Sequence, residues 1–210
     1  MVTKPRMQSR YNLSFTAASL RPELMRIAAE IFLASDSWDL TQKQILSTNA
    51  FQCRSSASAA RLEMELRQRL ELLTPAQLKL LAEASVEDRT AMAWLAACKR
   101  SGFIFEFATA MLREKLSSHD SVLRLSDYES FVDLQALSHA ELEALSPSSK
   151  TKIRQVVFNM LTESGMLSAG ATAKQIHRPV LSPPAFRAIV ADDPQWLACF
   201  LVPDNEIPRL

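Results

Sequence analysis

One stretch decides the fold that this chain of 210 residues is expected to adopt: residues 146–165 read SPSSKTKIRQVVFNMLTESG. Ser146 and Pro147 are typical of the cap and the first turn of a helix. Gly165 stands where a helix ends in a left-handed residue. Apolar residues recur between them at the helical period, and they are Ile153, Val156, Val157, Met160 and Leu161. The stretch therefore predicts one long helix with one buried face.

The charges of this helix run against its dipole. Lys150, Lys152 and Arg154 lie in the first half, and the only acid, Glu163, lies at the far end. Positive charge near a helix N-terminus costs a few tenths of a kcal/mol per residue. A bound anion such as a DNA phosphate explains the pattern, and a solvated basic face without a ligand is the alternative.

The surrounding segments predict a winged helix. Capping boxes at 126–129 and 138–141 indicate two short helices before the basic one. Residues 166–180 lack a helical period and contain Gly170, which favours a small hairpin. In a winged helix this hairpin places Lys174 and Arg178 on the DNA backbone beside the groove that the basic helix enters or flanks.

The rest of the chain is also predicted to be helical. It has only 3 glycines, whereas an average protein of this length has about 15, so a glycine-rich nucleotide loop and a many-stranded hairpin fold are excluded. Helix starts are expected at Pro22, at Thr41 (to about 48), at Ser55 or Ser56, at Thr74 (a capping box), at Ser85 (to 101), at Phe103 (to about 116) and at Ser182. We predict an all-α, multi-helix protein. A polar stretch near 117–125 divides it into an N-terminal helical subdomain, 1–120, and a winged-helix-like subdomain, 121–210.

A second candidate site lies in residues 41–70. A short helix, a turn at 49–52 and a second helix form a helix–turn–helix pattern, which presents the N-terminus of its second helix to DNA. The residues expected to reach phosphates or base edges are Arg54, Ser55, Ser56, Ser58 and Arg61. The alternative is structural: the serines only cap the helix, and arginines 61, 67 and 69 pair with acids four residues away.

Net charge does not exclude a polyanionic partner. The total is +1, but residues 1–73 carry +3 and residues 150–190 carry +5, offset by −4 over 74–149 and −3 over 191–210. Local charge decides which partners a surface attracts.

Other functional classes find little support in the sequence. Cys53, Cys98 and Cys199 are far apart, and no His or Cys spacing predicts a metal site. Neither a signal peptide nor a membrane span is expected, since the longest apolar run covers only 91–98. No catalytic motif is present, so we expect a cytoplasmic, non-enzymatic protein without a cofactor. Phe103, Phe105 and Phe107 are expected in the core rather than stacked on bases.

Several segments together resemble the BrxA family of bacteriophage exclusion (BREX) systems. They are YNLSFT at 11–16, SLRPE at 19–23, NAFQCRSSAS at 49–58 leading into Arg61, AWLAACKR at 93–100, EFA at 106–108 and LREK at 112–115. BREX systems mark host DNA by methylation and block phage replication. The resemblance implies a small, mostly helical, DNA-binding component with no catalytic residues to transfer.

The hypothesis is an accessory protein that binds duplex DNA mainly through phosphates. The competing class is an adaptor that holds other BREX proteins without touching DNA, with an exposed apolar patch expected around Trp196, Phe200 and Leu201. A metal-dependent nuclease is a weaker third hypothesis. The sequence leaves the oligomeric state open, with a monomer as the favoured state.

Overall fold

Helices make up most of the computed structural model, which describes residues 10–168 and 174–208. The all-α prediction with a small antiparallel sheet is confirmed. The α-helices are α1 (Pro22–Ser35), α2 (Trp38–Thr48), α3 (Ser56–Leu70), α4 (Pro75–Glu83), α5 (Val86–Arg100), α6 (Gly102–Glu106), α7 (Arg113–Ser117), α8 (Leu125–Ala136), α9 (Ala140–Glu143), α10 (Pro147–Glu163) and α11 (Pro183–Val190). The remaining elements are the 3-10 helices η1 (Ser14–Ala17) and η3 (Pro194–Phe200), the π-helical turn η2 (Phe107–Leu112), and the strands β1 (Val122–Leu123) and β2 (Lys174–Gln175).

Most helices begin where their caps predict. Among the predicted caps, the side chains that accept an N–H from three residues further on are Ser55, Thr74, Ser85, Ser146 and Ser182. Each cap satisfies one of the backbone donors that the first turn of a helix leaves without a partner. The predicted starts of α3, α4, α5, α10 and α11 are therefore confirmed.

Three predicted caps are wrong. Thr41 lies buried inside α2, which begins after Ser37, and its hydroxyl donates to the Ser37 carbonyl at 2.8 Å. Ser126 lies within α8, because the helix already begins at Leu125. The third, Ser138, lies one residue before His139, the N-cap residue of α9, and this helix has no side-chain cap. In each case a neighbouring residue or a tertiary contact outweighs the local cap signal.

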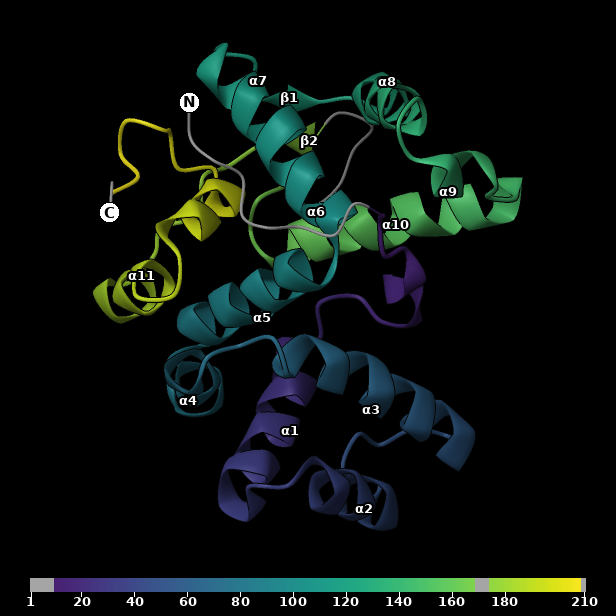
Figure 1. Cartoon of the computed structure of the whole chain (residues 1–210), viewed down its shortest axis with the longest axis vertical. Coiled ribbons are helices and arrows are strands. Elements are labelled where there is room, and N and C mark those ends of the chain that lie inside the picture. Colours follow the sequence, from purple (N-terminus) through teal and green to yellow (C-terminus); the bar gives the residue numbers. More distant parts are fainter. Residues whose placement is uncertain (1–9, 169–173, 209–210) are drawn as a thin grey trace.

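The helices form two levels around α5 (Figure 1). Helices α1 to α4 occupy the lower part of the view, and α6 to α10 lie above α5. Trp94 of α5 is buried and donates its indole N–H to the Cys199 carbonyl at 2.9 Å, which ties α5 to η3. Phe103, Phe105 and Phe107 are also buried, so their expected place in the core is confirmed. One buried apolar cluster includes residues on both sides of position 120, and the subdomain boundary there stays a prediction.

Around α10 the elements follow the order β1, α8, α9, α10, β2. Strand β2 pairs antiparallel with β1, with Val122 opposite Gln175, and Leu167 forms an isolated bridge with Ile176. Gly165 has φ +76°, as predicted for the residue that ends α10. Gly170, expected in the wing, lies outside the described residues.

None of the helices in the described ranges combines the length and the apolar character that a bilayer crossing requires. The apolar run at 91–98 belongs to α5 and is mostly buried in the core.

Candidate nucleic-acid interface

The turn between α2 and α3 is shaped by Asn49. Its backbone is left-handed at φ 48°, a conformation that asparagine tolerates better than most residues. Its side-chain amide donates to the Cys53 carbonyl at 3.1 Å, and its side-chain oxygen accepts the Cys53 N–H at 3.0 Å. These two bonds close the turn and fix where α3 begins. The helix–turn–helix pattern predicted for residues 41–70 thus forms as two packed helices.

The N-terminus of α3 is open to solvent and carries no acidic residue in its first turn. Ser55 caps the helix, and its hydroxyl also donates to the Ser58 hydroxyl at 2.9 Å. Ser56 is exposed, as are Arg54 and Arg61, and no acid among the described residues pairs with either arginine. Because the N–H groups of a first turn attract anions, this end of α3 offers a site for a phosphate.

The acids of α3 do not neutralise this end. Of the three expected pairs, Arg61–Glu65 and Glu63–Arg67 are not formed. Glu63 accepts from the Gln42 amide at 2.8 Å, and Arg67 pairs with Glu71 at 2.8 Å. The purely structural alternative therefore fails for Arg61.

The second site lies on the N-terminal half of α10. Lys150 and Lys152 are exposed and have no acidic partner among the described residues, while Arg154 is half-buried 3.7 Å from Glu129. At the other end of α10, Glu163 accepts the backbone N–H of Leu20 at 2.7 Å. An internal hydrogen bond thus accounts for the acid at the unfavourable end of the helix, and only the two lysines still lack an explanation within the fold.

The two cations predicted for the wing are more engaged. Lys174 is half-buried with its Nζ 3.5 Å from the Ser168 carbonyl. Arg178 makes two hydrogen bonds to Glu206, at 3.1 and 2.5 Å, and these lower the pKa of that carboxyl. Arg178 has to exchange an ion pair before it contacts DNA.

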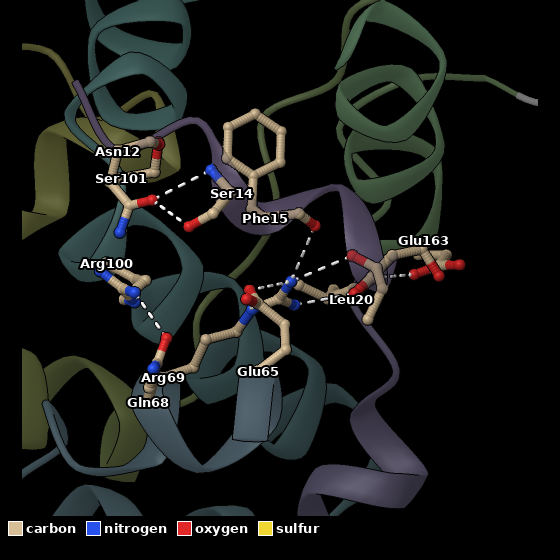
Figure 2. Close-up of polar contacts among 12 residues, drawn as sticks. Asn12, Ser14, Phe15, Leu20, Glu65, Gln68, Arg69, Arg100, Ser101 and Glu163 are labelled. Carbon is tan, nitrogen blue, oxygen red and sulfur yellow. Dashed lines mark hydrogen bonds and ion pairs between the residues drawn. The ribbon is translucent and has the colours of Figure 1, made fainter. Parts of the chain in front are cut away.

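The segment between Tyr11 and Leu20 lies between α3 and α10, and its short helix η1 contacts both. Arg69 of α3, which is fully buried, holds this segment: its guanidinium donates to the carbonyls of Ser19 (2.7 Å), Ala18 (3.0 Å) and Phe15 (3.4 Å), as Figure 2 shows in part. Arg69 is thus a buried structural residue rather than part of a solvent-exposed face. The predicted ion pair between Arg69 and Glu65 is present, with the two groups 2.9 Å apart, and it is buried.

This arrangement directs the two candidate sites to one side of the molecule. In Figure 1 the N-terminal ends of α3 and α10 both point to the right of the view, with α3 in the lower part and α10 in the upper part. The segment held by Arg69 and Glu163 fixes the position of α3 relative to α10. The fold thus keeps two basic helix ends in a fixed relation, as a rigid ligand with regularly spaced charges requires.

The family model of BrxA matches residues 9–193, which is most of the chain. The chain belongs to the BrxA family. The predicted resemblance is thereby confirmed.

Two BrxA relatives are named "BREX protein BrxA". The protein of Escherichia coli O9:H4 (strain HS) is 26% identical over 140 residues, which are 67% of this chain and 66% of that protein. The protein of Bacillus cereus (strain H3081.97) is 21% identical over 141 residues, 67% of this chain and 70% of the relative. The matches thus span about two thirds of each relative.

The BrxA chain also shares its fold with a solved structure. The crystal structure of an uncharacterized protein from Magnetospirillum magneticum superposes with a TM-score of 0.81 at 19% identity and covers 91% of this chain and 98% of the other. At this identity the likeness establishes the fold alone.

Two further expectations concern other classes of site in this BrxA chain. The described residues contain no group of three or more His, Cys, Asp or Glu side chains placed to hold a metal ion. The apolar patch expected of an adaptor is wrong at its predicted position: Phe200 and Leu201 are 1% and 2% exposed, and half-buried Trp196 packs edge-on against Phe105. Periodicity alone does not show that η3 turns these side chains into the core.

Proposed function

We propose that this BrxA family protein is a non-enzymatic, cytoplasmic accessory factor of a BREX phage-defence system that binds duplex DNA mainly through phosphate contacts. It acts without a cofactor. The first contact is the N-terminus of α3, through Arg54, Ser56 and Arg61. The second is the N-terminal half of α10, through Lys150 and Lys152, with Arg154 and Lys174 as further contacts.

One observation carries the proposal. Four exposed cations stand on or beside two capped helix N-termini, and no acid among the described residues pairs with any of them. Their charge raises the local potential without strengthening the fold, since cations near a helix N-terminus are unfavourable. An external polyanion that neutralises them supplies the missing stabilisation.

Fluorescence anisotropy of a labelled duplex over a salt series tests the proposal. If the four cations each neutralise one phosphate, log K falls against log salt with a slope of roughly −3 to −4. The Lys150→Glu/Lys152→Glu double variant should weaken binding at least about tenfold, because it replaces two attractions by two repulsions.

The matched control is Lys79→Glu/Arg187→Glu. It makes the same charge change at two exposed residues of α4 and α11, on the left of Figure 1, away from both sites. The affinity of this control variant for the duplex should stay close to that of the wild type once the change in net charge is taken into account. The proposed interface would be contradicted if the two double variants lost duplex affinity equally. It would also be contradicted if the duplex affinity did not depend on salt concentration.

An adaptor role is the second candidate function. Leu134 and Leu137, at the end of α8, are 63% and 84% exposed. Exposed apolar side chains that lie close together are typical of protein contacts. Pull-down of BREX proteins under nuclease treatment distinguishes the two functions: retention that depends on Leu137 and not on Lys152 favours the adaptor.

A further inference from the structure

A polar cavity of about 630 Å³ opens where four parts of the chain meet. Arg10 and Asn12 reach it from the N-terminal segment, Gln68 from the end of α3, Arg100 from the end of α5 and Trp196 from η3. Its volume lies within the range of small-molecule sites. The cavity lies at the opposite end of α3 from the proposed DNA contact: Gln68 is roughly 18 Å from Ser56 along the axis, at about 1.5 Å per residue.

Charge in the cavity is not balanced. Lys99 and Asp192 neutralise each other at 2.6 Å, and Glu71, which also lines the cavity, pairs with Arg67 at 2.8 Å. Of the two guanidinium groups in the wall, that of Arg10 makes only a long ion pair with Glu141, and that of Arg100 has no acidic partner among the described residues. The Arg10 side chain is 81% exposed and lies 4.0 Å from Glu141, too far for a hydrogen bond. The cavity wall therefore carries an excess of positive charge.

Hydrogen-bond donors converge there without an acceptor between them. Arg100 donates one N–H to Gln68 at 2.5 Å, and its buried Nε has no partner. The side-chain oxygen of Asn12 is occupied, since it accepts from both the N–H and the hydroxyl of Ser14. Its amide nitrogen must then face the other way, and Figure 2 shows it directed toward the guanidinium of Arg100. No acceptor among the described residues binds this nitrogen.

We propose that the cavity binds the phosphate group of a small molecule, a phosphate monoester such as a nucleotide, between Arg100 and Asn12. The phosphate oxygens accept from the Asn12 amide and from the free N–H groups of Arg100. A guanidinium matches this geometry better than an ammonium does. Arg10 closes the site on the solvent side, and the half-buried ring of Trp196 forms a flat wall for the rest of the ligand.

Isothermal titration calorimetry with inorganic phosphate, AMP and adenosine tests the site in the full chain. Phosphate and AMP should bind, and adenosine should not, because the charged group supplies the recognition. Arg100→Gln should weaken AMP binding about tenfold or more, the usual loss for a charged hydrogen-bond partner. Arg61→Gln, on the proposed DNA face, should leave AMP binding unchanged.

A second variant tests the site without removing a structural contact. Asn12→Asp keeps the oxygen that accepts from Ser14 but turns the free donor into a carboxylate facing Arg100. It should abolish AMP binding and raise the melting temperature, because the new carboxylate takes the position of the anion.

Three results would overturn the proposal. The first is no heat with either phosphate or AMP at about 1 mM ligand. The second is unchanged AMP affinity in Arg100→Gln. The third is an equal loss of duplex and AMP affinity in that variant, which assigns Arg100 to the DNA backbone instead. Loss of duplex binding in Arg61→Gln tests the proposed function separately and has no bearing on the cavity.

Discussion

At the scale of single residues, Arg69 determines how the N-terminal segment is held. Its buried guanidinium bonds three backbone carbonyls and Glu65, and burial lowers its pKa although the adjacent Glu65 opposes that shift. Arg69→Ala leaves a nearly buried carboxylate without its partner. We expect a loss of about 3–5 kcal/mol in the free energy of unfolding, measured by chemical denaturation.

The control at this scale is Arg67→Ala, two residues away on the same helix. Arg67 pairs with Glu71 where both side chains are partly exposed, so its removal should cost about 1 kcal/mol or less. The double variant Arg69→Met/Glu65→Leu should recover much of the lost stability, because it removes both buried charges together. Similar losses for Arg69→Ala and Arg67→Ala would mean that the buried network does not hold the segment.

At the scale of elements, Asp120 organises the start of β1. Its carboxylate accepts from Lys115 at 2.5 Å, from the Val122 N–H at 3.1 Å and from Arg124 at 3.3 Å. The bond from Lys115 contributes most to lowering its pKa to about 2. Since the folded pKa lies below the unfolded value near 3.8, this stabilisation is present above about pH 4 and is lost as the pH falls toward 2.

Thermal melts between pH 5 and pH 2.5 should show this loss. Asp120→Asn should lower the melting temperature at pH 5 and make the curve flatter below pH 4 than in wild type. Asp133→Asn, at an exposed carboxylate of α8 without an ion pair among the described residues, is the matched control and should keep the wild-type profile. A pH profile of Asp120→Asn that parallels wild type would show that the network contributes nothing.

At the scale of the whole molecule, the two helix N-termini are expected to act on one duplex. If each neutralises about two phosphates, Arg54→Gln/Arg61→Gln and Lys150→Gln/Lys152→Gln should each reduce the salt slope by about 2 units, and the quadruple variant should lose nearly all of it. The salt series described above measures this directly. If the salt slope of the quadruple variant were no smaller than that of either double variant, the two sites would not bind the same duplex.

Local chemistry made much of this structure predictable. Ser55, Thr74 and Ser146 cap their helices as expected, because a cap depends only on groups three residues apart. The failures at Thr41 and Ser126 share one cause. Each stands near a stronger competitor, such as the Ser37 cap or the Asp127 carboxylate that accepts the Arg124 N–H at 2.8 Å.

The candidate sites were predictable only in part. Clusters of basic residues are visible in the sequence, but the partners of charged side chains are not. Arg178 pairs with Glu206, which is 28 positions away, and Glu163 accepts from Leu20, which is 143 positions away. The phosphate cavity gave no sequence signal, because Asn12, Gln68, Arg100 and Trp196 share no motif. An arginine at a helix C-terminus is fully explained by the helix dipole until its neighbours are known.

The sequence by itself determined the helical class, most of the helix starts and the left-handed ending of the basic helix at Gly165, because these depend on backbone preferences within a few residues. It also determined that positive charge gathers in two segments of a nearly neutral chain. Only the tertiary structure decided which of those charges are free. Burial and long-range pairing place Arg69 in the core, occupy Arg178 and leave Arg54, Arg61, Lys150 and Lys152 facing solvent, since the availability of a charge depends on neighbours that the fold brings together.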